Sequence, residues 1–369
     1  MKKFIYADNA ATTQLDVDAF EAMKPYLLNE YGNPSQPYSF SRTTKKALAQ
    51  ARSIIADCIG ALEDEIFFTS GGTESDNWAI KCGGGSGDII TSAIEHHAVL
   101  NSCDERPERS HVTYILPNKD GFINPESIEK SITDKTQLVS IMSANNEIGT
   151  IQPVSLISHI CKKHGVLFHT DAVQAVGHIP LKVGEFGVDL LSASAHKFHG
   201  PRGIGFLYIK KGTKITPYLN GGSQEHGMRA GTQNVPAIVG MAYALKKAYD
   251  NMEKNISHVT TLEKRLIQGL IENNIEFLRN GGQHTLPGLI SLSFPGFDGE
   301  AILHRMDLKG IEVSTGSACD GQNPEISHVL RAIQLDDVFA RGTIRISLGD
   351  LNSVDDVIAI VKALSDIIH

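Results

Sequence analysis

A cysteine near the C-terminus stands among small and flexible residues, in the stretch STGSACDG at positions 314–321. Such a composition predicts an exposed loop, whereas free cysteines are among the side chains that proteins bury most often. An exposed thiol can act as a nucleophile once it ionises. Cys319 is therefore a candidate nucleophile, and the alternatives are a loop thiol without a role and a metal ligand. A permanent metal site is the weakest of these because no His or Cys stands at ligand spacing nearby, although iron could be held there transiently.

Two predicted strands end in polar residues that could do chemistry. The segment FHTDAVQAVG ends a strand with Asp171, and Gln174 follows three residues later. The segment SASAHKFHGPRG ends another strand with Ser194, His196 and Lys197. A lysine at the end of a buried strand is uncommon unless it is paired or takes part in chemistry. Because ligands of open α/β sheets bind outside the carboxyl ends of the strands, we expect these side chains at one site.

The turn after the first predicted strand, TSGGTESDNWAIK, is a candidate phosphate site. Gly71 and Gly72 permit a tight turn, and Thr73 is expected to cap the following helix with Asp76 at its third position. Such a turn presents free backbone N–H groups and a positive helix end, which suit a phosphate. Plain helix capping explains the same residues equally well. The turn is not a P-loop, because no Gly-Lys-Ser/Thr follows it.

A strand-end aspartate, a downstream lysine and a phosphate-binding turn together indicate pyridoxal 5′-phosphate. In sites for this cofactor a lysine forms the Schiff base, a carboxylate keeps the pyridinium nitrogen protonated, and a turn anchors the phosphate. Each feature is weak alone, but the combination of Asp171, Lys197 and the glycine turn is specific.

The elements that must position these residues alternate between strand and helix from about residue 65 to 210. This alternation predicts an α/β fold with a mostly parallel sheet that is covered on both faces. A long helical pattern follows at about 235–273, with a break expected near Ser257, and the remainder is typical of a smaller α+β domain. The predicted strands are 65–70, 88–92, 111–116, 137–142, 166–171, 188–194 and 203–209.

The composition is that of an ordinary globular protein. The 369 residues are 41% hydrophobic and carry a net charge of −8, which argues against nucleic acid or an anionic membrane surface as a partner. The N-terminus lacks the apolar stretch of a secretory signal, and no window approaches a membrane span. We therefore expect a cytoplasmic protein. The five cysteines form no C-x-x-C pair, and Cys58 and Cys161 are expected in the core on helical patterns.

Ten motifs in the same order resemble the pyridoxal-phosphate-dependent cysteine desulfurases of the NifS/IscS type, in the class V aminotransferase family. The resemblance runs through nearly the whole chain. The motifs are YADNAATT (6–13), GNPS (32–35), FTSGGTESDN (68–77), EHHAVL (95–100), NNEIG (145–149), HTDAVQ (169–174), SAHKFHGPRGIG (194–205), GMRAGT (227–232), STGSAC (314–319) and RISLG (345–349).

The resemblance implies the fold type I of pyridoxal-phosphate-dependent transferases, with a mostly parallel seven-stranded sheet in a large domain. It places the large domain at 14–258 and a smaller α+β domain at 1–13 and 259–369, which carries the Cys319 loop. It also implies a homodimer. The implied activity is removal of sulfur from L-cysteine, which leaves L-alanine and a persulfide on Cys319. The sulfur would then pass to an acceptor protein, such as an iron–sulfur scaffold or a tRNA-thiolation enzyme.

The resemblance also assigns roles to matching residues. Lys197 would form the Schiff base with pyridoxal 5′-phosphate and later move the substrate's α-proton. Asp171 would pair with the ring nitrogen, Gln174 would hydrogen-bond to the ring oxygen, and His96 would stack on the ring as a nearby acid or base. The expected catalytic residues are Cys319, Lys197 and His96. The expected cofactor-binding residues are Gly72, Thr73, His96, Asn146, Asp171, Gln174, Ser194, His196, Lys197 and Thr232.

The substrate and phosphate contacts follow from the same resemblance. The phosphate would be held by Thr73, Ser194 and His196, with Thr232 reaching in from a second subunit. Arg345 could bind the substrate carboxylate through two hydrogen bonds, although an ordinary salt bridge would explain it too. The expected substrate-binding residues are Asn33, Asn146 and Arg345.

The chain departs from the family pattern at several positions near the thiol, the substrate entry and the subunit interface. Asp320 places a negative charge beside the thiol, which should raise its pKa unless another group offsets it. The departures leave open the acceptor and the catalytic efficiency, and two other functions remain: a related aminotransferase or selenocysteine lyase, and a non-catalytic scaffold. The departing residues are Gln36, Tyr38, Ser41, Ser223, His226, Thr315 and Asp320.

Overall fold

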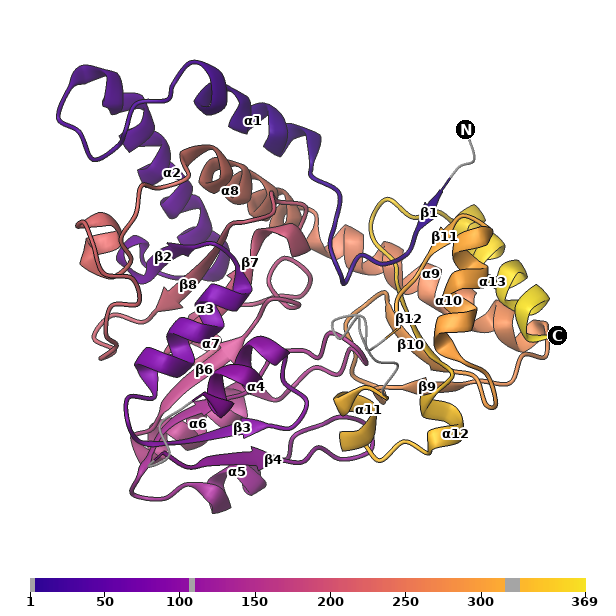
Figure 1. Ribbon diagram of the computed structural model, residues 1–369. Helices are drawn as coiled ribbons and strands as arrows, with labels where there is room; N and C mark the ends of the chain where they lie inside the picture. Colours follow the sequence, from indigo (N-terminus) through magenta and orange to yellow (C-terminus); the bar gives the residue numbers. More distant parts are fainter. Residues whose placement is uncertain (1–3, 106–109, 316–325) are drawn as a thin grey trace.

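A seven-stranded sheet forms the larger part of the molecule. The computed structural model of the chain describes residues 4–105, 110–315 and 326–369 (Figure 1). The strand order is β2-β8-β7-β6-β5-β3-β4, and β8 runs antiparallel to both of its neighbours while the other pairs are parallel. The seven predicted strands are therefore confirmed. They are β2 (Ile66–Thr69), β3 (Asp88–Ser92), β4 (Val112–Ile115), β5 (Thr136–Ser140), β6 (Leu167–Asp171), β7 (Leu190–Ser194) and β8 (Gly205–Ile209).

Both faces of this sheet are buried. Successive side chains of a strand point to opposite faces, so Phe68 and Leu191 belong to one core cluster while Phe67 and Leu190 belong to another. This burial explains why the strands are continuous apolar runs rather than alternating ones. The helices that pack in the first cluster are α2 (Arg42–Ile59), α5 (Pro125–Ser131), α6 (Val154–His164) and α8 (Val235–Asp250). Those in the second are α3 (Gly72–Trp78), its extension η3 (Ala79–Gly83) and α4 (His97–Asp104).

A smaller α+β part, drawn in orange and yellow in Figure 1, lies beside the large sheet. Its antiparallel sheet has the order β12-β10-β9, and its separate core cluster contains Leu266 and Leu364. The N-terminal strand β1 pairs with β11. The strands here are β1 (Ile5–Tyr6), β9 (Leu278–Asn280), β10 (Leu289–Ser293), β11 (Ile311–Glu312) and β12 (Thr343–Ser347). The helices in this core are α9 (Met252–Glu272), α10 (Gly299–Leu308) and α13 (Val354–Ile368).

The predicted α/β architecture is thus confirmed, whereas the domain boundaries near residues 13 and 258 stay a prediction. The predicted break near Ser257, inside the long helical pattern, was wrong. The break falls at Asn251, between α8 and α9, and the helix continues through Ser257. Asn251 leaves the helical conformation and its side-chain amide donates to the Lys247 carbonyl, which ends α8. The remaining helices are α1 (Val17–Leu28), α7 (Val183–Phe186), α11 (His328–Ala332), α12 (Asp337–Ala340), η1 (Ser39–Ser41), η2 (Glu63–Glu65), η4 (Ala195–Lys197) and η5 (Gln224–Gly227).

Two cysteines predicted to lie in the core are confirmed there. Cys58 is 9% exposed and Cys161 is 1% exposed. Burial raises the pKa of Cys58 to about 11 and that of Cys161 to about 12, so neither thiol ionises near neutral pH. Within the described residues, no helix is both long enough and apolar enough to cross a membrane.

Candidate active site

Lys197 ends η4, directly after β7, and lies against the N-terminal segment. Its Nζ donates to the carbonyl oxygens of Ala10 at 2.6 Å and Ala11 at 2.9 Å. Gln174 Nε2 donates to the same Ala10 oxygen at 2.9 Å. The structure therefore joins two predicted cofactor residues through a backbone carbonyl that the sequence argument did not single out. The motif YADNAATT was the available signal, but only the fold shows what its alanines do.

Asp171 ends β6 at the same edge of the sheet as Lys197. Parallel pairing sets Asp171 opposite Ser192 of β7, so the ends of the two strands lie together. The carboxylate is 6% exposed and accepts a hydrogen bond from the Val173 N–H at 2.9 Å. Burial raises the pKa of Asp171, and the charges of His96 and Lys197 act in the opposite direction. These three predicted residues thus face one another across the sheet edge.

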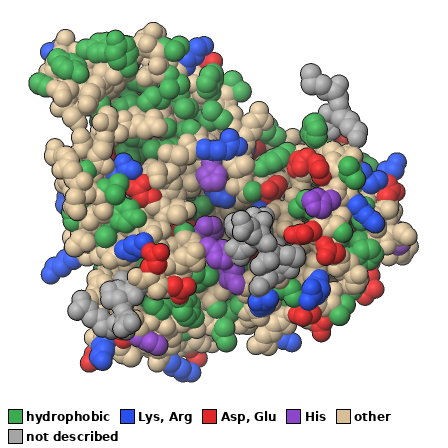
Figure 2. All heavy atoms as spheres, in the orientation of Figure 1, with side chains coloured by type: hydrophobic (Ala, Val, Ile, Leu, Met, Phe, Trp, Pro, Cys, Tyr) green, Lys and Arg blue, Asp and Glu red, His purple; other side chains and the backbone are tan. Residues whose placement is uncertain are grey.

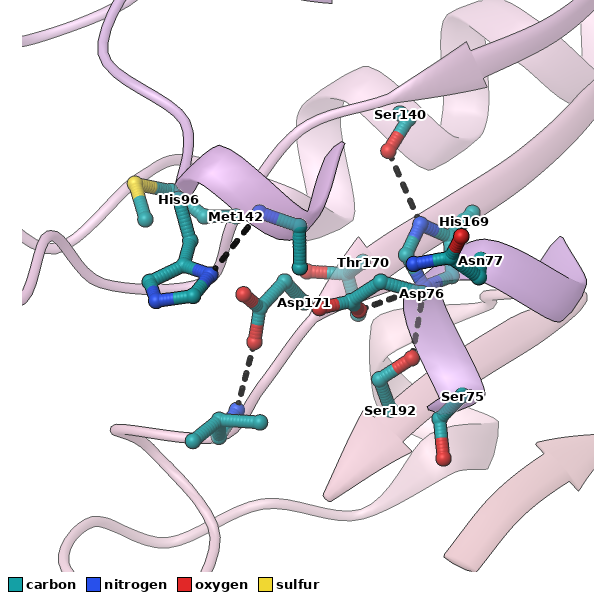
Figure 3. A network of polar contacts seen from close by, with 12 residues as sticks. Ser75, Asp76, Asn77, His96, Ser140, Met142, His169, Thr170, Asp171 and Ser192 are labelled. Atoms are coloured by element: carbon teal, nitrogen blue, oxygen red, sulfur yellow. Dashed lines mark hydrogen bonds and ion pairs between the residues drawn. The ribbon is translucent and has the colours of Figure 1, made fainter. Parts of the chain in front are cut away.

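His96 caps the N-terminus of α4. Its Nδ1 accepts a hydrogen bond from the Ala98 N–H at 3.0 Å, so the neutral ring carries its proton on Nε2 (Figure 3). Burial lowers the pKa of His96, with the Asp171 charge opposing that shift. A neutral imidazole beside Asp171 can stack on a ring and exchange a proton near pH 7.

The glycine turn adjoins the end of β7, but its local geometry differs from the prediction. Helix α3 begins at Gly72 with Gly71 as its N-cap, so Thr73 is not the cap and Asp76 is not a capping residue. Gly71 has φ +151°, which favours glycine over residues with a side chain. A Cβ on Gly72 would lie 2.6 Å from Val173 Cγ2, and Ser194 Cβ would lie 3.6 Å from it. The turn and Ser194 are therefore neighbours.

His196 contacts the N-terminal segment, whereas Thr232 is exposed. His196 Nδ1 and the Thr12 hydroxyl are 3.1 Å apart, and burial lowers the pKa of His196 to about 4. His196 is therefore neutral near pH 7 and can donate only one N–H to an anion. Thr232 is exposed on the segment between η5 and α8.

The predicted substrate residues are not all brought together. Arg345 on β12 is 6% exposed, and its Nη2 donates to Asp8 Oδ1 at 2.8 Å. Its Nη1 donates to the Asn146 carbonyl oxygen at 2.8 Å, while its Nε has no hydrogen-bond partner in the described structure. Asn33 Oδ1 accepts from the Ser35 N–H, in the segment between α1 and α2 that lies far from β12 in Figure 1.

Cys319 and Asp320 lie outside the described residues, but the residues on either side of their segment contact the site. The Ser314 N–H donates to the Arg345 carbonyl oxygen at 3.0 Å. On the other side, His328 Nε2 lies 3.0 Å from the Glu95 carbonyl oxygen. Figure 2 shows several histidine side chains gathered near the centre of this face of the molecule.

Comparison with known proteins covers almost the entire chain. Residues 5–360 match the family described as aminotransferase class-V. The chain belongs to this family. It is 48% identical over 376 residues to a protein named cysteine desulfurase IscS from Dictyoglomus turgidum, covering 100% of this chain and 95% of the relative. It is 45% identical over 373 residues to a cysteine desulfurase IscS from Methanosarcina thermophila, covering 100% and 92%.

Solved structures agree with these class-V aminotransferase relatives. A NifS-like protein superposes with a TM-score of 0.92 at 38% identity, covering 99% of each chain. A structure described as SspA in complex with cysteine superposes with a TM-score of 0.83 at 35% identity, covering 95% of this chain and all of the other. These full-length similarities are to NifS/IscS-type cysteine desulfurases, and members of this group depend on pyridoxal 5′-phosphate.

The residues present in this class-V site fit that cofactor. The set contains a primary amine, a buried carboxylate and a neutral imidazole at one edge of the sheet, from Lys197, Asp171 and His96. The turn at Gly72 leaves no room for a Cβ. No cluster of three or more His, Cys, Asp or Glu side chains in the described ranges could hold a metal ion.

Proposed function

We propose that this site removes the sulfur of L-cysteine, releases L-alanine and retains the sulfur as a persulfide on Cys319. The full-length similarity to cysteine desulfurases supports the reaction, and the neighbour solved with cysteine supports the substrate. The observation that carries the proposal is the meeting of Lys197, Asp171 and His96 at one edge of the sheet.

Each residue of this set has a task when the cofactor is bound. Pyridoxal 5′-phosphate supplies an electron sink for the charge that develops on the substrate carbon. Asp171 would hold the ring nitrogen, Gln174 the ring oxygen, and the Gly72 turn with Ser194 the phosphate. Lys197 would attach the cofactor and then carry the substrate's α-proton. His96 would cover the ring and exchange a proton through Nε2.

Cys319 would carry the sulfur. Its thiolate attacks the sulfur of the substrate, so that a sulfur–sulfur bond forms and the carbon–sulfur bond breaks. The electron pair of the broken bond stays with the carbon, which takes up a proton on the way to alanine. The adjacent Asp320 charge disfavours the thiolate, so we expect Cys319 to react faster as pH rises.

Arg345 would bind the substrate carboxylate beside Asn146, whereas Asn33 stays a predicted substrate residue that the fold of this chain does not bring to Arg345. Two of its nitrogens are already engaged by Asp8 and the Asn146 carbonyl, whereas the buried Nε has no partner in the described residues. A donor without an acceptor is costly when buried, which favours an incoming anion at this position.

Incubation of the holoenzyme with L-cysteine and a reductant tests the function. We expect sulfide and alanine in equal amounts, and loss of nearly all sulfide release in Cys319→Ser. Cys82→Ser is the matched control, because Cys82 is partly exposed and lies away from the sheet edge. Full sulfide release by Cys319→Ser would contradict the persulfide role. Such a result would favour a related lyase or aminotransferase, neither of which needs this thiol.

The remaining proposals concern assembly. We propose a cytoplasmic homodimer in which Thr232 of one copy reaches the phosphate of the other, and a sulfur-acceptor protein as the partner. Light scattering of the purified holoenzyme measures the dimer. Co-expression of Lys197→Ala with Thr232→Ala chains tests the shared site, since mixed dimers regain one intact site only if Thr232 acts across the interface.

A further inference from the structure

Three carboxylic acids are buried together beneath the edge of the sheet that carries the site. Asp76 is 1% exposed, Glu95 is 0% exposed and Asp171 is 6% exposed. They come from α3, the segment before α4, and the end of β6. Figure 3 shows the Asp76 side chain between Asp171 and the His169 ring. The proposed function uses Asp171 alone.

Asp76 has no cationic side chain against it among the residues that the structure describes. Its Oδ1 has no partner within hydrogen-bond distance among the described residues, and His169 Nε2 lies 3.7 Å away. The Ser192 hydroxyl also interacts with the carboxyl group. An ionised carboxylate buried with an unused oxygen would lose its hydration without compensation.

His169 does not supply the missing charge. The ring is 0% exposed and lies between two hydroxyls, with Nδ1 2.8 Å from Ser140 Oγ and Nε2 3.0 Å from Ser192 Oγ. Burial lowers the pKa of His169 to about 3, so the ring is neutral at physiological pH. The contact between Asp76 and His169 is therefore a polar contact and not an ion pair.

Glu95, like Asp76, is a buried acid with one carboxylate oxygen that has no hydrogen-bond partner among the described residues. Its Oε1 accepts hydrogen bonds from the Ser92 hydroxyl and, at 3.0 Å, from the Met142 N–H. Its Oε2 has no partner in the described part of the chain. Burial raises the pKa of Glu95 to about 8, with the Asp171 charge adding to the shift.

The described part of the neighbouring elements holds too few cationic side chains to balance three ionised acids. His96 and Lys197 face Asp171, but His96 is neutral and Lys197 is the proposed attachment point of the cofactor. Arg229, which also contacts α3, is paired with Glu74 through hydrogen bonds of 2.8 and 3.0 Å. Burial and the neighbouring charges of Asp171 and Glu95 raise the pKa of Asp76 well above its ordinary value.

We propose that Asp76 and Glu95 are positioning residues that hold a proton each and leave Asp171 as the one ionised carboxylate of the three when the cofactor is bound. This inference rests on the proposed function only for the role of Asp171. The two neutral acids keep negative charge off the surroundings of Asp171, because two further ionised carboxylates would draw the proton of the cofactor ring away from its intended partner. A neutral carboxylic acid also loses less hydration on burial than a carboxylate, which suits an Oδ1 atom without a hydrogen-bond partner in the described structure.

Infrared spectroscopy of the holoenzyme in heavy water at pH 7 tests the proposal without measuring activity. A protonated carboxylic acid has a carbonyl band separate from those of carboxylates and amides. We expect Asp76→Asn and Glu95→Gln each to remove the intensity of one buried acid, and Asp171→Asn to remove none. Raising the pH through about 8 should abolish the Glu95 band, because burial raises the pKa of Glu95 to about 8.

The control is Asp134→Asn, which changes an exposed aspartate and should leave the acid bands as they are. An unchanged spectrum in Asp76→Asn, or loss of one acid band in Asp171→Asn, would overturn the proposal. If a variant fails to fold or to retain cofactor, the wild-type holoenzyme with ¹³C-labelled aspartate carboxyls gives the answer by NMR. One protonated aspartate at pH 7 is expected, and none would refute the assignment. Either result is independent of whether the enzyme desulfurises cysteine.

Discussion

Two aspartate–histidine contacts in this molecule differ in charge, because one is neutral and the other is an ion pair. Asp76 lies 3.7 Å from His169, and burial raises the pKa of the acid and lowers that of the histidine. Asp350 lies 3.2 Å from His199. There, the hydrogen bond to His199 lowers the pKa of Asp350. Burial lowers the pKa of His199, but the hydrogen bond and charge of Asp350 outweigh burial and raise it.

Access to water explains the difference. The Asp76 and His169 side chains are 2% and 0% exposed, whereas those of Asp350 and His199 are 37% and 22% exposed and line an open cleft of about 580 Å³. Where water solvates both partners, the ion pair is retained. Where it cannot, desolvation costs more than the attraction repays, and the proton stays on the acid. The same two residue types therefore give a neutral contact in the buried core and a charged one in the open cleft.

A buried arginine gives a third case, because its guanidinium group stays protonated and therefore charged. The Arg345 and Asp8 side chains are 7% and 18% exposed and 2.8 Å apart. The buried charge of Arg345 is therefore balanced by the charge of Asp8 and not removed by loss of a proton. The predictions below change each of these contacts, beginning with the ionised acid that the neutral ones surround.

Asp171→Asn should have the largest effect. It removes the carboxylate that we propose as the partner of the ring nitrogen, and loss of one such electrostatic contact lowers kcat on the order of 10²–10³-fold. Steady-state alanine production, with the absorption of bound cofactor recorded in parallel, measures this. Asp134→Asn serves as the exposed control. A kcat within twofold of the parent value would contradict the role of Asp171 as the one ionised acid that acts on the cofactor ring.

Asp8→Asn should lower the free energy of unfolding by about 3 kcal/mol, since removing one partner leaves the buried Arg345 charge uncompensated. Urea unfolding of the holoenzyme measures the change. Asp64→Asn is the matched control, because Asp64 and Lys211 form an exposed pair 2.8 Å apart whose attraction is screened by water, so its loss should change the free energy of unfolding far less. Equal effects of the two substitutions would break the link between burial and pair strength.

Ser192→Ala should cost about 1–3 kcal/mol of unfolding free energy. It removes the hydroxyl 3.0 Å from His169 Nε2 and leaves a buried ring nitrogen without that partner. Denaturant unfolding at pH 7 gives the value. An unchanged free energy of unfolding would show that the Ser192 hydroxyl is not needed to satisfy the buried His169 ring.

Asp350→Asn should have the smallest effect, about 0.2–1 kcal/mol, because its pair with His199 is partly exposed. Asp350 has a lowered folded-state pKa, so its contribution is lost as pH falls through that value; His199 has a raised one, so its contribution is lost as pH rises through it. The destabilisation should therefore be greatest between about pH 4 and 6.5. Melting temperatures across this range measure it, and an effect that grows above pH 8 would contradict the sign.

Much of the fold and part of the site could be predicted from local pattern. The seven strands follow from apolar runs, and the parallel arrangement brings Asp171 and Lys197 to one edge. The break at Asn251 and the helix start at Gly72 were missed, because Asn and Thr are both compatible with several positions around a helix end. Only the structure shows that Asp76 is buried instead of capping a helix.

The sequence by itself determined which chemical groups this protein has and the order in which the strands present them. It contains a lysine and an aspartate at strand ends, a glycine turn, and Cys319 in a small-residue stretch. Tertiary structure decided which of those groups carry charge. Asp8 meets Arg345 across 337 positions of chain, and Asp76 and His169 lose water in a core built from several elements. The protonation state of a side chain depends on its solvation and on partners distant in the sequence, and neither can be inferred from the residues next to it in the chain.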